Sequence, residues 1–558
     1  MPPGTGNPQH QQPMKLISIH RLTVSVFFVL GIALQLHAQL FTVQRHFTNS
    51  PDGANPGTLV LAGSEIYGTA ANGGGSNSGM VFKLGTNNAG FSTLYNFSGG
   101  TNGASPNELL LKDGTFFGTT YVGGNYGYGT VFYLSTNGTG CSTIYHFTNL
   151  PDAEYPMGGL ILGGRTLYGT TASGGSSGNG TVFKLNTNGT GYAVLHSFTN
   201  TPDGTTPRAG LLLNGATLYG TTAFGGTYGN GTVFKLNTNG TGYTIIYNFS
   251  NTPDAQFPYA TLAFSNNLLY GTASGGGSNN GGAVFTLKTN GTSYSVLHHF
   301  TGPTSPASDS DGAYPKSELV VNGAMLYGTT VSGGSGGYGT IFQMITNGTG
   351  FLVLKNFTNS PDGANPQEGL ILNNNALWGT TYYGGSSLNG TAFSLLLSPA
   401  ITLQPSSLTV TNGDPATFTT AATGSGQLYY RWYFKTNTTI AGGTNTTLCF
   451  TNAVTNLVGS YLAIVTNLYG SATSSPASLI VVTMPNLFDY SLDPVSGGFS
   501  LSMANVAKST NRLWATTNLA NAGAWRAIAT NVMATNGLWF FTDTASTNRI
   551  RFYRLSTP

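Results

Sequence analysis

Residues 210–249 read GLLLNGATLYGTTAFGGTYGNGTVFKLNTNGTGYTIIYNF, and this stretch decides the fold. It holds four short apolar runs, at 211–213, 217–222, 232–236 and 243–249, separated by Asn-Gly, by a Gly-rich loop and by Asn-Thr-Asn-Gly. Short apolar runs bounded by turn residues predict β-strands joined by tight turns. Strands that are apolar along their whole length predict a sheet covered on both faces, as in the four-stranded blade of a propeller.

The Tyr-Gly-Thr in the middle of this stretch, or a close variant of it, occurs seven times in the chain. Its glycines are Gly68, Gly118, Gly169, Gly220, Gly271, Gly328 and Gly379. Their spacing of about 51 residues lies among the periods of propellers and solenoids, in which each unit buries itself only against its neighbours. The repeat therefore predicts an array of identical small sheets.

The two ends of the array distinguish a closed ring from an open solenoid. The last unit stops after residues 390–397 and lacks a fourth strand, whereas residues 40–47 (LFTVQRHF) match a fourth strand that has no partners before it. Joining the two completes a seventh unit, while a solenoid would leave open edges that invite aggregation. We therefore predict an all-β chain whose residues 39–398 form a seven-bladed β-propeller, closed by one N-terminal and three C-terminal strands.

Composition fits this prediction and argues against other classes. Only 7% of the 558 residues are charged, 80 are glycine, and the formal net charge is +3. A nucleic-acid groove needs a concentrated basic face, which is missing from the sequence, so we expect no nucleic-acid partner. The two cysteines, Cys141 and Cys449, fall in different predicted domains and give no disulfide framework. We expect a monomer without a cofactor.

Residues 14–38 have the pattern of a secretory signal peptide. Lys15 and Arg21 precede an apolar stretch that ends in small residues. Residues 1–13 would then be a disordered extension, with Met14 as an alternative start. An uncleaved anchor helix is the competing interpretation, but the apolar stretch is short for a membrane span. We expect a secreted or cell-surface protein with no transmembrane anchor beyond this segment.

The repeat pattern itself resembles a known family. Asp-Gly-x-x-Pro, Leu-Tyr-Gly-Thr-Thr, Gly-Gly, Gly-Thr-Val-Phe and a closing Phe resemble the bacterial GloVer tandem repeats of exported, choice-of-anchor proteins, over about residues 40–397. Some units depart from it, with Ile66-Tyr67, Phe116-Phe117 and Leu377-Trp378 in place of Leu-Tyr. The resemblance implies an exported repeat protein of undefined biochemical activity and supplies no catalytic residues.

Residues 399–483 resemble an immunoglobulin-like β-sandwich. Trp432 stands where the core tryptophan would be, and Tyr461 stands at the tyrosine corner. Thr420 and Ala463 occupy the places of the disulfide cysteines. Core packing alone must therefore hold this domain.

Residues 484–558 resemble the small β-rich modules that close many secreted bacterial proteins. Six cations make this module mildly basic: Lys508, Arg512, Arg526, Arg549, Arg551 and Arg554. The charges would suit an anionic surface polymer. Solvated charges that suppress edge pairing are the alternative, and we favour that interpretation.

The candidate ligand-binding residues are aromatics in the Gly-rich loops. These loops and the links between units, such as residues 199–209, are predicted to share one end of the ring, and long loops on rigid scaffolds carry function. The residues are Tyr121, Tyr126, Tyr128, Phe224, Tyr228, Tyr338, Tyr382 and Tyr383. Such rings beside Asn and Thr suit a neutral sugar or a peptide. The alternative is that each ring fills the groove between adjacent units.

An aspartate recurs in the links, at Asp52, Asp152, Asp203, Asp254, Asp311 and Asp362. Pro-Asp-Gly is a turn sequence in which Asp bonds the backbone two residues ahead, and we expect that role. Asp309 and Asp311, in the insertion at 301–315, are weak metal candidates because Asp-Ser-Asp-Gly is too short for a helix–loop–helix calcium site. The mature-chain histidines, expected to be strand residues, are His46, His146, His196, His298 and His299.

These features favour an exported recognition protein that binds extracellular carbohydrate or protein through the long-loop face. One alternative is a structural or adhesive surface protein without a small-molecule ligand, which predicts that the loop rings are buried. Another is a glycan-active hydrolase or lyase, which requires acids, His or Arg that break the repeat and converge near the axis. The sequence contains no recognisable catalytic constellation, so we expect no enzyme.

Overall fold

The computed structural model describes residues 40–86, 90–250, 252–302, 311–373, 375–425, 427–435, 437–467 and 469–482, and six strands between 486 and 556. This part of the chain is all-β, as predicted; its one helical element is a 3₁₀ turn, Thr455–Leu457. No helix in it has the length and apolar character needed to span a bilayer. The predicted extension (1–13) and signal peptide (14–38) lie outside the described residues.

Seven four-stranded antiparallel sheets follow one another along the repeats. In strand order, sheet 1 is β2(Ala54–Ala62), β3(Glu65–Asn72), β4(Met80–Gly85) and β5(Ser92–Asn96); sheet 2 is β6(Ala104–Lys112), β7(Thr115–Val122), β8(Thr130–Ser135) and β9(Ser142–His146); sheet 3 is β11(Ile161–Gly163), β12(Thr166–Thr171), β14(Thr181–Asn186) and β15(Ala193–Ser197); sheet 4 is β16(Leu212–Asn214), β17(Thr217–Thr222), β18(Thr232–Asn237) and β19(Thr244–Asn248).

Sheet 5 is β21(Ala263–Ser265), β22(Leu268–Ala273), β24(Ala283–Lys288) and β25(Ser295–His299); sheet 6 is β26(Val320–Asn322), β27(Met325–Thr330), β28(Thr340–Ile345) and β29(Leu352–Asn356); sheet 7 is β30(Ile371–Asn373), β31(Ala376–Thr381), β32(Thr391–Leu396) and β1(Phe41–His46). Two short ribbons accompany them, β10(Ala153–Glu154) with β13(Ser173–Gly174) and β20(Ala255–Gln256) with β23(Gly275–Gly276).

Packing explains why the Tyr-Gly-Thr glycine recurs. In sheet 4, Gly220 lies directly opposite Phe234. A Cβ atom at Gly220 would lie 2.5 Å from Cζ of Phe234 and 2.9 Å from Cδ2 of Leu211, closer than real contacts allow. The aromatic ring therefore occupies the space that a side chain would need. The same pairs recur as Gly68–Phe82, Gly118–Phe132, Gly169–Phe183, Gly271–Phe285, Gly328–Phe342 and Gly379–Phe393.

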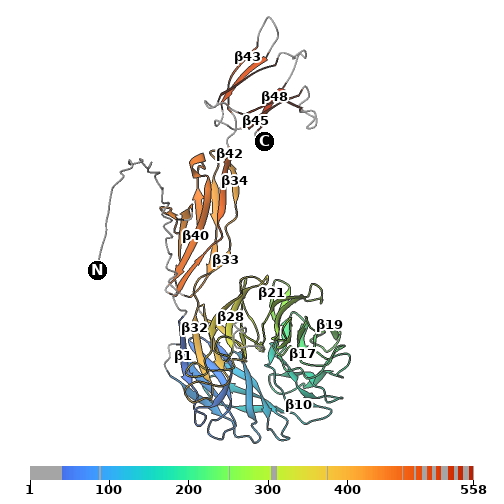
Figure 1. Cartoon of the computed structure of the whole chain (residues 1–558). Helices are drawn as coiled ribbons and strands as arrows, with labels where there is room; N and C mark the ends of the chain where they lie inside the picture. The colour runs from blue at the N-terminus through green and yellow to red at the C-terminus, as the bar shows by residue number, and fades with distance from the viewer. Residues whose placement is uncertain are drawn as a thin grey trace, which may run out of the picture. The chain divides into compact units, whose positions relative to one another are not determined.

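The strand before the repeats completes the last sheet, as predicted. β1 pairs antiparallel with β32, and Figure 1 shows β1, in blue, beside the yellow-orange β32. The Phe41 ring lies 5.3 Å from that of Phe393 and 5.8 Å from that of Phe357. Pairing with the N-terminal strand removes the open edge of β32.

A hydrophobic cluster joins each sheet to the next, and one of these clusters joins sheet 7 to sheet 1. In the latter, Trp378 and Ala392 of sheet 7 pack with Leu59, Ile66 and Phe82 of sheet 1. The six others join sheets 1 and 2, 2 and 3, 3 and 4, 4 and 5, 5 and 6, and 6 and 7. Each sheet is therefore covered on both faces by its neighbours, which accounts for its continuously apolar strands.

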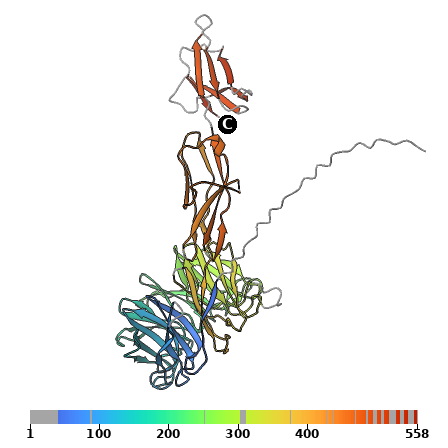
Figure 2. The ribbon, with the colours of Figure 1, turned by 90° about the vertical axis from the view of Figure 1, so that its left-hand side faces the viewer.

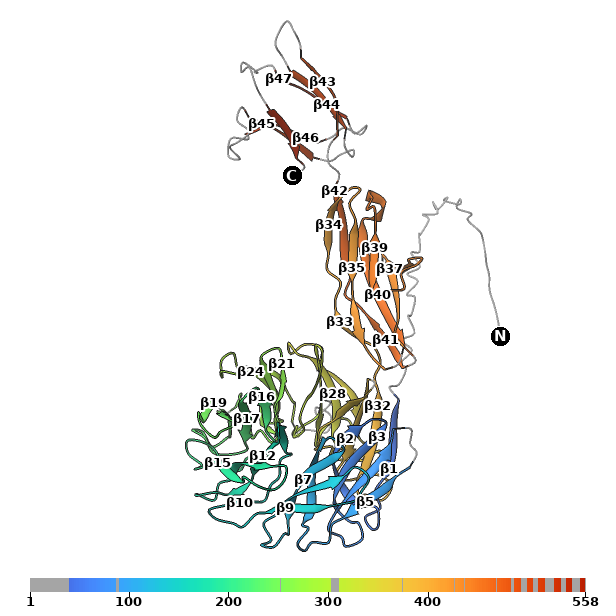
Figure 3. The same ribbon diagram turned by 180° about the vertical axis from the view of Figure 1, so that it is seen from behind.

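Strands after the repeats surround a separate core. They are β33(Ala400–Leu403), β34(Leu408–Thr411), β35(Ala416–Thr419), β36(Ala421–Thr423), β37(Tyr429–Phe434), β38(Thr438–Thr439), β39(Thr447–Phe450), β40(Gly459–Asn467), β41(Gly470–Thr473) and β42(Ala477–Val482). Figure 3 shows β37, β40 and β41 side by side. Trp432 is fully buried in this core, and the Tyr461 hydroxyl donates to the Leu457 carbonyl at 2.6 Å. Thr420 and Ala463 are buried as well.

Two three-stranded sheets follow, drawn in red in Figure 2. One contains β43(Asn486–Leu492), β44(Phe499–Ala504) and β47(Leu538–Asp543). The other contains β46(Arg526–Val532), β45(Thr510–Thr516) and β48(Phe552–Ser556). The prediction that this segment is β-rich is confirmed for its described strands.

Candidate ligand-binding site

The links between sheets share an unusual backbone conformation. In every link, the residue before the last proline, such as Asn55 before Pro56, has a positive φ of 55–59°. This conformation is uncommon outside glycine. The backbone N–H of the residue before this proline donates to a carbonyl in the Gly-rich loop of the preceding sheet; for Asn55 the acceptor is Asn389 of sheet 7, at 2.9 Å. The other six residues are Ser105, Tyr155, Thr206, Phe257, Tyr314 and Asn365. Each link is thus fixed to the neighbouring sheet.

The residues that follow these prolines line one cavity of about 410 Å³. Every link contributes to it, although each contributes a different side chain. The residues directly after the prolines are Gly57, Asn107, Met157, Arg208, Tyr259, Lys316 and Gln367. Because all seven links meet there, the cavity is the place where substitutions from different repeats come together.

Three glutamates in the wall of this cavity have pKa values raised above the ordinary value. Burial, together with the Glu368 carboxylate, raises the pKa of Glu108 to about 7. Burial and Glu108 raise the pKa of Glu318 to about 8, and burial also raises the pKa of Glu368, although that group accepts a hydrogen bond of 3.1 Å from the Thr58 hydroxyl. At neutral pH Glu318 therefore holds its proton and Glu108 is partly protonated, whereas ordinary glutamates would be ionised.

Cations and an aromatic ring line another part of the cavity. The guanidinium carbon of Arg208 lies 5.2 Å from the centroid of the Tyr259 ring, and Nζ of Lys316 lies 5.4 Å from it. Burial and the charge of Arg208 lower the pKa of Lys316. The negative face of the ring holds both cations in place. The cavity can therefore offer cationic, aromatic and proton-donating groups to one ligand.

The predicted aromatic residues divide into three groups. Tyr121 and Tyr382 line the cavity. Tyr126, Tyr228, Tyr338 and Tyr383 are exposed on the Gly-rich loops and do not line it. Phe224 and Tyr128 are half-buried between sheets, with ring centroids 5.4 Å from Phe257 and 5.9 Å from Tyr155. Some of these rings are therefore exposed, whereas others fill the groove between adjacent units.

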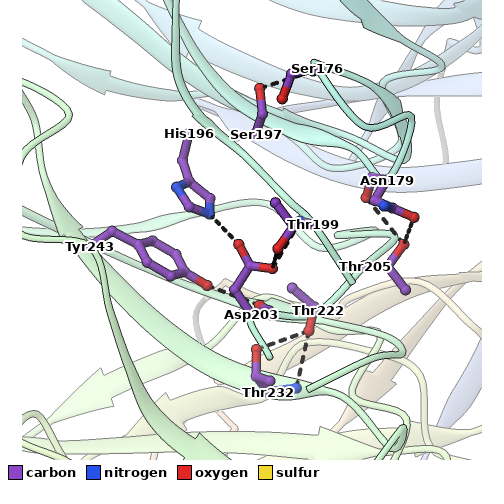
Figure 4. A network of polar contacts seen from close by, with 10 residues as sticks. All are labelled: Ser176, Asn179, His196, Ser197, Thr199, Asp203, Thr205, Thr222, Thr232 and Tyr243. Carbon is purple, nitrogen blue, oxygen red and sulfur yellow. Dashed lines mark hydrogen bonds and ion pairs between the residues drawn. The ribbon is translucent and has the colours of Figure 1, made fainter. Parts of the chain in front are cut away.

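The link aspartates sit in hydrogen-bonded turns, and Figure 4 shows the example of Asp203. Its Oδ1 accepts bonds from the backbone N–H and the hydroxyl of Thr199, at 2.8 and 2.7 Å. Its Oδ2 lies 2.9 Å from Nε2 of His196, a strand residue whose ring stacks on Tyr243. These bonds tie the turn to the preceding strand. Asp203 is a turn residue, as expected, but its backbone partner is the N–H of Thr199, four residues before it, and not a group two residues ahead.

Of the two weak metal candidates, Asp309 and Asp311, the structure describes only Asp311. Asp309 lies outside the described residues. Asp311 accepts a bond from the Thr301 hydroxyl and pairs with His298 at 3.0 Å. Among the described residues, no group of three His, Cys, Asp or Glu side chains could hold a metal ion. The described cysteines, Cys141 and Cys449, are both free thiols.

The sequence interpretation missed the glutamates and the cations of the cavity. It sought acids that break the repeat only in the insertion at 301–315. The signal lay instead in the two or three positions after each link proline, where Glu108, Arg208 and Lys316 interrupt an otherwise regular repeat. The position directly after the last link proline has the same place in every repeat but holds a different residue in each. Such a position indicates a site that the repeats share.

Comparison with known proteins identifies the family. The model of the Gloeobacter/Verrucomicrobia repeat matches residues 31–223, 112–308 and 214–447. No curated protein matches the chain.

Solved structures similar to part of the chain include fragments of titin. A chimeric titin Z1Z2 carrying a decorin peptide is 23% identical over 16% of this chain and 98% of its own, with a TM-score of 0.15. Titin M4 is 26% identical over 16% of this chain and 99% of its own, with a TM-score of 0.14. Since the repeat matches together span residues 31–447, the chain belongs to the Gloeobacter/Verrucomicrobia repeat family.

Proposed function

We propose that sheets 1 to 7 are the blades of a seven-bladed propeller whose central cavity recognises extracellular carbohydrate. The observation that carries this proposal is the cavity to which all seven links contribute. The cluster between sheets 7 and 1 and the bond from Asn55 to Asn389 support a closed ring. Export is expected from the signal-like pattern of residues 14–38.

The chemistry of the cavity favours a sugar over a protein. Its volume of about 410 Å³ falls in the range of small-molecule sites and is too confined for a protein surface. Tyr121 and Tyr382 offer aromatic faces, and Gln367 offers an amide that can both donate to and accept from hydroxyl groups. Asn107 donates its amide protons to Thr119 and to the Pro156 carbonyl, so only its Oδ1 is left to accept a bond from a ligand. A ligand with many hydroxyls and apolar ring faces matches this lining.

A glycan array probed with the full chain tests the proposal. The informative variant is Tyr121→Ala/Tyr382→Ala, and the matched control is Tyr126→Ala/Tyr228→Ala, whose rings are exposed outside the cavity. We expect selective binding that the first variant loses and the control keeps. Loss in the control alone would place binding on the outer loops, and silence across the array would favour a structural role.

The three glutamates favour one second candidate, a glycan-active hydrolase or lyase. Glycan hydrolysis uses a carboxylic acid that holds its proton and a second carboxylate, and Glu108 and Glu318 retain protons near neutral pH. Reducing ends or unsaturated products released from the glycans that bind would establish this activity, provided that Glu108→Gln and Glu318→Gln abolish it. Binding without product would exclude it for those glycans.

A further inference from the structure

Arg208 and Lys316, the two cations of the cavity, lie against the same aromatic ring. Within the part of the chain that the structure describes, neither Arg208 nor Lys316 forms an ion pair. Tyr259 holds them together although their charges repel, and this repulsion contributes to the lowered pKa of Lys316. An anion between them would relieve the repulsion and form charge-assisted hydrogen bonds.

We infer that Arg208 and Lys316 bind the carboxylate of a uronate residue in an acidic polysaccharide. This inference rests on the proposed carbohydrate function. The planar guanidinium of Arg208 matches a carboxylate with two parallel bonds, and the ammonium of Lys316 adds a second charge. The hydroxyl groups of the same sugar then face the amide of Gln367 and Oδ1 of Asn107, which line the same cavity.

The glutamates make this site sensitive to pH. With Glu108, Glu318 and Glu368 protonated, the cavity carries two positive charges and attracts an anion; with all three ionised, one negative charge remains in excess. The other titratable groups that line it are the phenols of Tyr121, Tyr259 and Tyr382, and burial raises the pKa of the latter two. Ionisation of the glutamates as the pH rises, together with loss of the Lys316 proton, whose pKa is lowered by burial and by Arg208, therefore weakens uronate binding.

A second hollow provides room for the next residue of a chain-like ligand. Its volume is about 370 Å³, and it shares Tyr259 and Lys316 with the central cavity. Phe257 and Tyr314 also line it. Because Lys316 belongs to both hollows, a carboxylate bound there would sit between two sugar subsites. An oligosaccharide is therefore a better probe than a monosaccharide.

Calorimetric titration of the full chain with trigalacturonate and with its fully methyl-esterified form tests the inference. The two probes have the same sugar backbone and differ in charge. We expect the acid to bind at least 10-fold more tightly than the ester at pH 6, and to lose at least 10-fold in affinity between pH 6 and pH 9. Arg208→Gln/Lys316→Gln should remove the preference for the acid. The control Arg165→Gln/Lys288→Gln removes the same charges from exposed positions outside both hollows and should keep it.

The outcomes separate this inference from the proposed function. Equal binding of acid and ester, or binding only of other glycans on the array, would overturn the uronate site and leave the carbohydrate function standing. Tighter binding of a peptide through its C-terminal carboxylate would overturn the choice of a sugar. Silence for the trisaccharides and for the whole array would overturn both.

Discussion

The hydroxyl groups of Thr171 and Thr181 lie 2.8 Å apart and are buried between two central strands of sheet 3. Thr171 also donates to the Ser173 carbonyl at 2.9 Å, so its one proton is committed and Thr181 must be the donor of the pair. Equivalent pairs occur in sheets 2, 4, 6 and 7. Where the pair is missing, both members are apolar: Ala70 faces Met80, and Ala273 faces Ala283.

This arrangement predicts unequal costs for the two threonines. Thr171→Val leaves the buried Thr181 proton without its acceptor and removes the hydroxyl bond to the Ser173 carbonyl, and should cost about 2 kcal/mol in the free energy of unfolding. Thr181→Val removes only the donor and should cost about 1 kcal/mol. The double variant should cost less than the sum of the two, measured by urea denaturation as a double-mutant cycle. Strict additivity would mean that the hydroxyls do not interact.

Strand β1 should be essential for the stability of sheet 7. Phe41→Ala removes a ring packed on Phe357 and Phe393 and should lower the free energy of unfolding by about 2–3 kcal/mol. Leu40→Ala, at an exposed neighbour, is the control and should change it by less than about 0.5 kcal/mol. Deleting residues 40–46 should expose β32 and cause self-association, measured by light scattering. A monomer of unchanged stability would contradict closure by this strand.

Much of the fold was accessible from the sequence because the repeat samples each structural position seven times. Gly220 and Phe234 recur in every unit since each is required by contacts within its own sheet, which every unit must make. Strand limits were predicted to within a residue, as for 217–222, which is β17. The matching of residues 40–47 to a missing fourth strand followed from the same logic.

The cavity was less accessible because its residues belong to no single repeat. Glu108, Glu318 and Glu368 come from sheets 2, 6 and 7, and their proximity depends on how the units are arranged in space. Comparison of the repeats reveals the residues that all units share, and it gives no reason to group residues that differ from one unit to the next. The aromatic search found Tyr121 and Tyr382 but missed Tyr259, which lies in a link and not in a Gly-rich loop.

The link aspartates should act on stability and not through a metal. Asp254 accepts bonds from Ser250 and Tyr247, at 2.7 and 3.0 Å, and from the hydroxyl of Tyr294 in the next repeat. Asp254→Ala should therefore cost about 2–4 kcal/mol in the free energy of unfolding, whereas Asp414→Ala, at an exposed position without a positive φ, should change it by less than about 0.5 kcal/mol. Chelation with EDTA should leave the melting temperature unchanged. A fall on chelation would contradict the turn interpretation.

The buried glutamates should make the protein less stable as the pH rises. The pKa of Glu318 is about 8 in the folded state against an ordinary 4.5, so the folded state holds the proton more tightly than the unfolded chain. The resulting stability is fully present below pH 4.5 and disappears as the pH rises through 8. The glutamine of Glu318→Gln cannot ionise. Between pH 6 and pH 9 the free energy of unfolding of this variant should therefore fall by about 1–2 kcal/mol less than that of the unmodified protein. This figure allows for the solvent in the cavity, which weakens the effect.

The comparison of Glu318→Gln with the unmodified protein is free of histidine titration above pH 7. Burial lowers the pKa of His146, His196 and His299, so these groups destabilise the fold as the pH falls below their ordinary value and act in the opposite direction from the glutamates. The difference between Glu318→Gln and the unmodified protein, measured by urea denaturation at pH 7, 8 and 9, therefore isolates the contribution of Glu318, because Lys316 titrates in both proteins. Parallel curves for Glu318→Gln and the unmodified protein across this interval would show that Glu318 is already ionised at neutral pH, and that the cavity does not hold its proton.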